Sequence, residues 1–180
     1  MVQRRRRPLP PSRQQLPATP SMEHRWSPWR YDYIASVGAT PATCPFCVDA
    51  DPGNDGERLI VYRGTHNFII LNLYPYNVGH FLVAPYTHVA QLDDSPAEMM
   101  AEMMVLSRRG IGALRKLYNP EGFNLGMNLG HSAGAGIRGH LHMHVVPRWN
   151  GDANFMTIAG ETRVLSEDLS VTYRRLVEVF

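Results

Sequence analysis

Cysteine is scarce in this chain: two cysteines among 180 residues exclude the class of small secreted scaffolds held by disulfides. Long apolar runs are missing as well, because Asn72, Pro75 and Gly79 interrupt the best candidate and a membrane-spanning helix needs about 18 consecutive apolar residues. No apolar core follows the arginines near the N-terminus, so no secretory signal is predicted. With 44% hydrophobic and 19% charged residues, the sequence predicts a globular cytoplasmic protein with no membrane partner.

Acidic residues are absent from residues 1–21, which hold five arginines. The other residues carry 13 of the 18 basic side chains and all 16 acidic ones, so their balance is −3 although the whole chain is +2. That balance does not favour a nucleic-acid partner for the domain. Residues 1–21 are predicted to be a disordered basic, Pro-rich tail, either solvated or an arm for an acidic partner. A third interpretation is a start-site artefact, because Met22 precedes a segment dense in aromatic residues.

Apolar periodicity and turn residues predict a single domain over residues 22–180 with an α+β fold. The expected architecture is an antiparallel sheet of about five strands, with one long helix and a C-terminal helix near residues 170–179. The predicted strands span residues 58–63, 66–73, 79–84, 123–129 and 140–146.

The long helix has clear start and stop signals. Ser95 is the predicted N-cap, with Pro96 at the first helical position and Glu98 closing a capping box. Residues 119–122 (NPEG) are expected to end the helix. Helical spacing predicts that its buried face consists of Met100, Met103, Ser107, Ile111 and Leu114.

Three histidines alternate with apolar residues in the segment 139–149 (GHLHMHVVPRW). Side chains two apart on a strand share a face, so His140, His142 and His144 are expected on one face and the apolar residues between them in the core. Two functions fit such an array: ligands of one metal ion, or a nucleophilic imidazole with helpers. The outer pair would start about 13 Å apart, from the rise per residue, and a shared ion holds its ligands at about 2 Å. The spacing therefore favours the nucleophile.

A glycine-rich loop leads into this strand. Residues 128–139 (NLGHSAGAGIRG) place glycines around Ser132, and such a loop brings backbone N–H groups close to an anion. It has neither the lysine nor the spacing of a Walker A loop, and a strand follows it instead of a helix. Loop and strand together predict a phosphate site beside a nucleophile.

The alternation HLHMHVV resembles the motif of the histidine-triad (HIT) family. The similarity covers about residues 26–149 and includes NLYPYNVGHFLVAPYTH at 72–88 and NLGHSAG at 128–134. The ending PRWNGDANF at 147–155, with NLYPYN, is similar to the branch that cleaves diadenosine tetraphosphate by phosphorolysis. The resemblance implies a HIT-like fold, a dinucleoside polyphosphate substrate and a homodimer or larger homo-oligomer.

The resemblance also implies roles for individual residues. His142 would attack the α-phosphate and form a nucleotidyl-histidine intermediate, which inorganic phosphate or water then discharges. His144 would assist as a phosphate contact. The remaining substrate-binding candidates are Asn72 for the ribose, Asn128, Ser132, Gly134 and Gly136 for the phosphates, and Trp149 beside the nucleotide. Asn72 has the alternative of capping the turn that follows it, and Trp149 that of packing. Many relatives carry Gln or Ser where Gly136 stands, which leaves phosphate contacts there to the backbone or to Ser132.

The two cysteines stand in the motif CPFC at residues 44–47. A redox motif opens a helix after a buried strand, whereas turn-rich segments surround this one. A zinc site needs two further ligands, and the resemblance supplies His88, in PYTH, and His140. We therefore expect Cys44, Cys47, His88 and His140 to hold a structural Zn²⁺ ion in a closed site.

The prediction is a HIT enzyme that transfers a nucleotidyl group from a dinucleoside polyphosphate. Three alternatives stay open at this point: a HIT-type hydrolase of nucleoside phosphoramidates or nucleotides, a metal-dependent enzyme with the triad as ligands, and a non-catalytic nucleotide-binding module.

Overall fold

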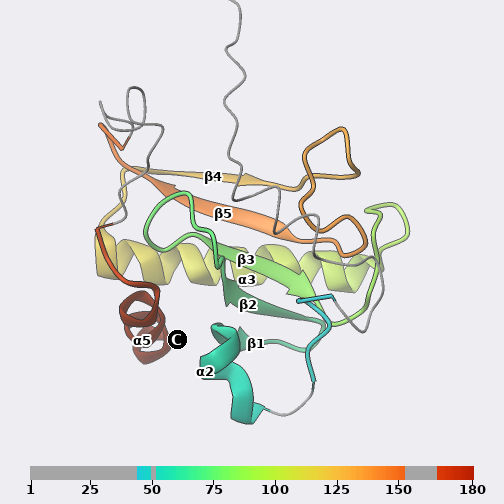
Figure 1. The fold of residues 1–180 in the computed structure, drawn as a ribbon, viewed down its shortest axis with the longest axis horizontal. Helices are drawn as coiled ribbons and strands as arrows, with labels where there is room; N and C mark the ends of the chain where they lie inside the picture. Colours follow the sequence, from blue (N-terminus) through green and yellow to red (C-terminus); the bar gives the residue numbers. More distant parts are fainter. Residues whose placement is uncertain (1–43, 50–51, 153–165) are drawn as a thin grey trace, which may run out of the picture.

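A computed structural model describes residues 44–49, 52–152 and 166–180. The predicted basic tail, 1–21, lies outside them. Five antiparallel strands form one sheet in the order β1-β2-β3-β5-β4 (Figure 1). The predicted α+β class and strand number are confirmed. The strands are β1 (Ile60–Arg63), β2 (Asn67–Leu71), β3 (Phe81–Pro85), β4 (Gly122–Gly126) and β5 (Met143–Arg148).

Among the described residues, four helical segments accompany the sheet: η2 (Pro52–Asn54), α2 (Asp55–Arg58), α3 (Ala97–Tyr118) and α5 (Leu169–Val179). The long helix and the C-terminal helix were predicted, whereas η2 and α2 were not. The prediction that a strand begins at residue 58 is wrong, because Arg58 ends α2 and Leu59 follows in the left-handed conformation with φ 62°. That reversal turns the chain from α2 into β1. None of the helices described is both long and apolar enough to cross a membrane.

The start of α3 differs from the prediction. Pro96 is the N-cap and no side chain caps the helix; the Ser95 hydroxyl instead donates to the Gln91 carbonyl at 2.8 Å. The buried face is also rotated, since Met99 is buried and Met100 only partly so. Seven residues of α3 are buried: Met99, Met103, Leu106, Ser107, Gly110, Ala113 and Leu114.

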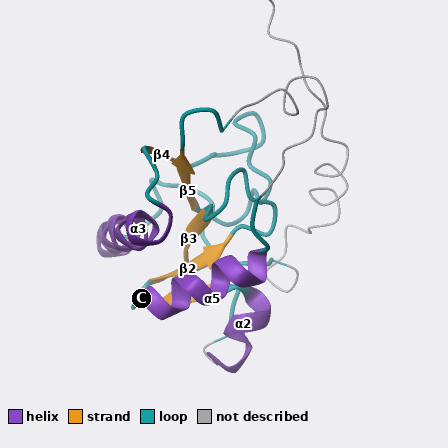
Figure 2. Cartoon of the chain, turned by 90° about the vertical axis from the view of Figure 1, so that its left-hand side faces the viewer, coloured by secondary structure: helices purple, strands orange, loops and turns teal. Residues whose placement is uncertain are grey.

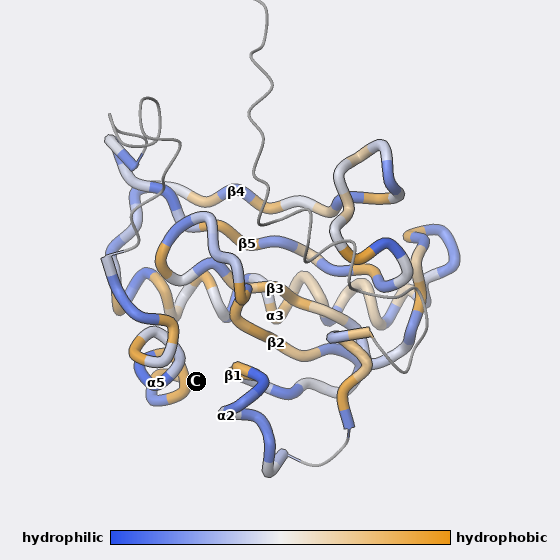
Figure 3. The backbone as a smooth tube through the Cα atoms, in the orientation of Figure 1, coloured by the Kyte–Doolittle hydropathy of each residue, from blue (hydrophilic) through white to orange (hydrophobic). Residues whose placement is uncertain are grey.

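Two apolar clusters lie on opposite faces of the sheet. One packs between the strands and α3, and Val83, Met103 and Val145 are fully buried in it. The other consists of Cys44, Phe46, Ile60, Phe68, Ile70, Leu82 and Ala84. In Figure 2, α3 stands on one side of the strands and loops stand on the other. Figure 3 shows the apolar character of β2 and β3, the strands that both clusters share. Because α3 covers one face of the sheet, a ligand-binding site is expected on the opposite face, among the loops.

The histidine segment only partly belongs to the sheet. β5 begins at Met143, so His140 and His142 precede it, and the backbone N–H of Leu141 donates to Val89 O at 2.7 Å outside the ladder. The prediction of a strand from residue 140 is wrong in this respect. The alternation persists nevertheless, because Leu141 and Val145 are 2% and 0% exposed.

Candidate active site and metal centre

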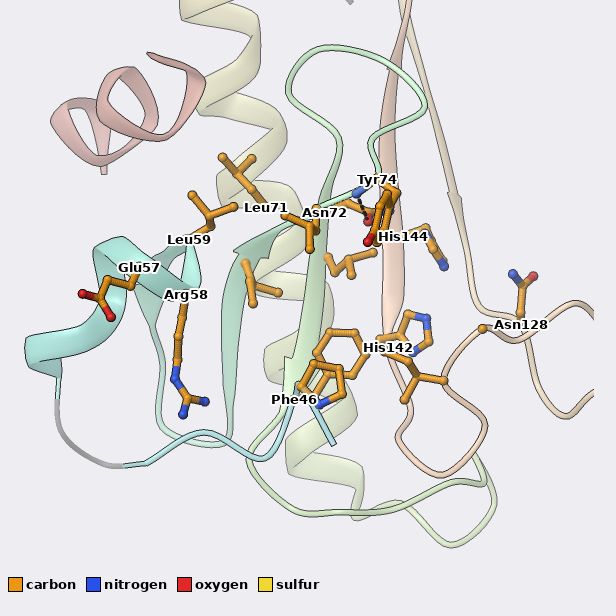
Figure 4. A pocket seen from close by; sticks show the side chains of 16 residues that line it. Phe46, Glu57, Arg58, Leu59, Leu71, Asn72, Tyr74, Asn128, His142 and His144 are labelled. Atoms are coloured by element: carbon orange, nitrogen blue, oxygen red, sulfur yellow. Dashed lines mark hydrogen bonds between the residues drawn. The ribbon is translucent and has the colours of Figure 1, made fainter. Parts of the chain in front are cut away.

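A cavity of about 340 Å³ opens on the face opposite α3. Its wall is apolar, with Phe46 from the cysteine loop, Ile70 and Leu82 from the sheet, and Ile137 from the glycine-rich loop. Figure 4 shows Asn72, Asn128, His142 and His144 gathered at one end of the cavity and Glu57 and Arg58, from α2, at the other. An apolar cavity with imidazoles and amides at one end suits a nucleobase joined to a phosphate.

His142 is held with one ring nitrogen unprotonated. Its Nδ1–H donates to the backbone carbonyl of His140 at 2.9 Å, because a carbonyl can only accept. The lone pair of a neutral ring then lies on Nε2. Burial lowers the pKa of His142 below its ordinary value, so the ring is neutral at pH 7. The ring of Phe46 packs against it at a centroid distance of 4.9 Å. A neutral ring with its lone pair on Nε2 has the protonation state that a nucleophilic imidazole requires.

His144 has the opposite tautomer, imposed by His80. The backbone N–H of Tyr76 donates to His80 Nδ1 at 3.0 Å, so His80 carries its proton on Nε2. That Nε2 lies 3.1 Å from His144 Nδ1, which accepts. His144 therefore keeps its proton on Nε2 and can donate it to an anionic oxygen. No pattern in the sequence indicates this role of His80.

Asn72 directly follows β2 and caps the following turn. Its Oδ1 accepts from the backbone N–H of Tyr74 at 3.0 Å, and its Nδ2 lies 3.3 Å from His80 Nδ1. The turn-capping role is therefore present. The residue also lines the cavity, so a contact with a ribose does not exclude that role.

The structure brings Cys44, Cys47, His88 and His140 together. Their ligand atoms all lie within 4.8 Å of one another. Cys44 Sγ is 3.4 Å from His140 Nδ1, and Cys47 Sγ is 3.2 Å from His88 Nδ1. A tetrahedral zinc ion with bonds of 2.0–2.3 Å separates its ligand atoms by roughly 3.5 Å. The residue types and their closest separations therefore fit a Zn²⁺ ion, with small side-chain shifts for the more distant pairs.

His140 is oriented for that role by its other nitrogen. Nε2–H donates to the Pro85 carbonyl at 2.8 Å, which directs the Nδ1 lone pair to the cysteines. Burial, with smaller contributions from neighbouring imidazoles, lowers the pKa of His140 to about 4. The ring is thus neutral at pH 7, as a metal ligand must be.

Residues 55–151 match the HIT domain family model. The chain belongs to the HIT family. It is 42% identical over 163 residues to AP-4-A phosphorylase of Mycobacterium tuberculosis, an alignment covering 86% of this chain and 83% of that protein. This similarity confirms the prediction of a HIT-family enzyme.

Solved HIT structures share the fold. A zinc-bound histidine triad protein from Mycobacterium smegmatis has a TM-score of 0.60 and 29% identity, over 78% of this chain and 94% of that one. A hypothetical histidine triad nucleotide-binding protein from Sulfolobus tokodaii has a TM-score of 0.58 and 25% identity, over 76% of this chain and 91% of that one. The expected HIT-like architecture is therefore confirmed.

Not every residue expected from the HIT motif lines the cavity. Asn128 and Gly136 do, whereas Ser132 and Gly134 are exposed on the loop and are absent from its lining. Trp149 lies at the far end of β5, where its indole N–H donates to Tyr118 O at 3.3 Å and its ring lines a different hollow. Within the described residues, Trp149 therefore does not line the cavity that holds His142.

Proposed function

We propose that this HIT protein transfers a nucleotidyl group from a dinucleoside polyphosphate to inorganic phosphate through His142. The observation that carries the proposal is the fixed tautomer of His142, whose Nε2 lone pair belongs to a buried neutral ring beside an apolar cavity. The M. tuberculosis relative, named for phosphorolysis of AP-4-A, supports the choice of substrate and acceptor.

The proposed reaction has two displacements. In the first, the His142 Nε2 lone pair attacks the α-phosphorus, and the bridging P–O bond breaks with its electron pair leaving on the oxygen of a nucleoside triphosphate. In the second, a phosphate oxygen attacks the same phosphorus, and the N–P bond breaks with its electron pair returning to Nε2. Diadenosine tetraphosphate and phosphate thus give ATP and ADP. The Nε2–H of His144 and the Asn128 amide stabilise charge on the non-bridging oxygens.

The alternative in which all three triad histidines bind one metal ion has no geometric support. Nδ1 of His140 faces Cys44, and its Nε2 donates to Pro85 O. Nδ1 of His142 donates to the His140 carbonyl. The ring nitrogens of the described triad therefore serve separate partners. Zn²⁺ at the four-residue centre would hold the cysteine loop, with Phe46, against the active site.

Product analysis tests the proposal. The protein is incubated with diadenosine tetraphosphate with and without phosphate, and nucleotides are separated by chromatography. ADP and ATP that form only with phosphate are the expected result. AMP and ATP without phosphate would assign water as the acceptor, and no turnover would favour a binding module. His142→Ala should abolish turnover, whereas His131→Ala, an exposed histidine of the preceding loop, should retain it. We also propose a homo-oligomer, which sedimentation velocity tests.

A further inference from the structure

A second hollow, of about 330 Å³, adjoins the active site on the same face of the sheet. Asn128 and His144 line both this hollow and the cavity that holds His142. From them the second hollow extends over β5 and β4, with Asn124, Gly126 and Arg148 in its lining. The two hollows thus meet at the residues proposed to contact the transferred phosphate.

The strand register explains why the second hollow is polar at its far end. His144 and Arg148 are four residues apart on β5 and point to the same face, about 13 Å apart along the strand. Gly126 pairs with His144, and Asn124 pairs with Val146. Gly126 has no side chain, so the floor beside His144 is open. The register therefore places the His144 imidazole at one end of the second hollow and the Arg148 guanidinium at the other. Because the hollow is elongated along the strand, it is called the trough below.

Arg148 is held rigidly in this trough. Its Nε and one terminal nitrogen donate to Asp152 at 2.6 and 2.9 Å, and the other terminal nitrogen donates to Asn124 Oδ1 at 2.7 Å. A guanidinium has five N–H donors, so two of them donate to no described residue. The side chain is 46% exposed. A fixed guanidinium with remaining donors is suited to phosphate oxygens.

The geometry of displacement decides which group would use the trough. The leaving oxygen departs on the side of the phosphorus opposite the attacking nitrogen, roughly in line with it. The second displacement expels His142 itself, so the acceptor must enter from the side that the leaving group vacated. If the first cavity holds the transferred nucleoside, departing and entering phosphates share the other side.

We infer that the second hollow is the subsite for the departing polyphosphate chain, with Arg148 contacting its distal phosphates and Asn124 positioning Arg148. The subsite would admit the acceptor phosphate after the nucleoside triphosphate leaves. The inference rests on the proposed function. It assigns a ligand class, a linear polyphosphate, to residues that the nucleophile does not touch.

Two substrates separate this role from a general structural one. The first displacement releases a nucleoside triphosphate from diadenosine tetraphosphate but ammonia from adenosine 5′-phosphoramidate. With the phosphoramidate, the trough therefore holds no phosphate during this first displacement, which is the step that kcat/KM of the nucleotide substrate reports. Losing a charged hydrogen bond at this site should lower kcat/KM of Arg148→Gln on the tetraphosphate about tenfold or more. Its kcat/KM on the phosphoramidate should stay within twofold of the wild type. Asn124→Ala, which keeps the Asp152 pair, should show a smaller loss with the same selectivity.

Arg108→Gln is the matched control, because it removes an exposed arginine of α3, the helix that covers the opposite face. This control variant should have the same kcat/KM as the wild type on both substrates. Equal losses on both substrates in Arg148→Gln and Asn124→Ala would overturn the subsite, as would full activity of both variants on the tetraphosphate.

A binding measurement keeps the inference separate from the proposed function. Inorganic tripolyphosphate is titrated calorimetrically into the wild type and into Arg148→Gln, with no turnover required. The dissociation constant should rise about tenfold in the variant. Equal affinities, or no binding to the wild type, would refute the subsite. Tight, Arg148-dependent binding in a protein that does not cleave dinucleoside polyphosphates would support the subsite and overturn the proposed function alone.

Discussion

At the scale of single residues, one short segment carries three histidines in three different chemical settings. His140 donates from Nε2 to Pro85 O, His142 donates from Nδ1 to His140 O, and His144 accepts on Nδ1 from His80. Each partner decides which nitrogen keeps its lone pair. The lone pairs are thus left for the proposed metal centre at His140, for the proposed nucleophile at His142 and for the contact of His144 with a neighbouring histidine.

The resemblance to the HIT family implied separate roles for the three histidines, but it did not indicate that His80 would contact His144. The alternation of histidines with apolar residues is a local pattern, which a reader of the sequence can detect. The contact of His80 with His144 joins residues 64 positions apart, and it exists because Leu82 pairs with His144 across β3 and β5. Such a partner follows from the strand register, which the sequence alone does not fix.

His80 is expected to act as a positioning residue. His80→Leu removes the donor to His144 Nδ1, so the Nε2–H of His144 is no longer fixed toward the phosphate. We expect kcat to fall about tenfold or more with a smaller change in KM, as for a lost hydrogen bond to a charged group. His80→Gln can accept from Tyr76 N and donate to His144, and should recover most of kcat. If both variants lose activity equally while remaining folded, the tautomer argument is wrong.

At the scale of elements, the long helix, its C-terminal end at Tyr118 and the five strands were predictable, whereas the start of the helix and the exact ends of the strands were not. The spacing of apolar residues along the sequence predicts that a strand or helix exists, but where a helix is capped depends on local backbone geometry. Ser95 has the residue type of an N-cap, yet its hydroxyl donates to Gln91 O. α2 has only four residues, too few for a periodic signal, although it lines the cavity through Glu57 and Arg58.

The packing of α3 on the sheet depends on one glycine. A Cβ added at Gly110 would lie 2.3 Å from the Phe81 ring, whereas a Cβ at Gly112 meets nothing within 4 Å. Gly110→Ala should lower the free energy of unfolding by about 1–3 kcal/mol through overpacking. Gly112→Ala should raise it by up to about 1 kcal/mol through helix propensity. Urea denaturation measures the free energy of unfolding of both variants. A Gly110→Ala protein as stable as the wild type would show that the close approach of α3 to the sheet does not require a glycine at this position.

At the scale of the whole molecule, the proposed metal centre and the proposed active site are in direct contact through Phe46. Phe46 stands between the two cysteines, packs on His140 and His142 at 5.4 and 4.9 Å, and forms part of the cavity wall. Residues that lie 96 apart in the chain, Cys44 and His140, meet there. The resemblance supplied the four ligands, but their coupling to the cavity through Phe46 needed the fold.

We therefore expect about one zinc ion per chain, measured by elemental analysis of the purified protein. Removing zinc with a chelator, or with Cys47→Ser, should lower the midpoint of thermal unfolding, because binding to the folded state alone stabilises it. His66→Ala, which removes an exposed histidine outside the centre, is the control and should keep its zinc. Zinc content that does not depend on Cys47 would place the metal elsewhere.

The central claim, that His142 carries the nucleotidyl group, is tested most directly by trapping the intermediate. The protein is mixed with diadenosine tetraphosphate in the absence of phosphate, quenched under alkaline conditions and analysed by intact and peptide mass spectrometry. An adenylyl group on His142, absent from His142→Ala and discharged as ADP when phosphate is added, is the predicted result. Turnover by a protein that never carries the group, or a group on a residue other than His142, would contradict the account.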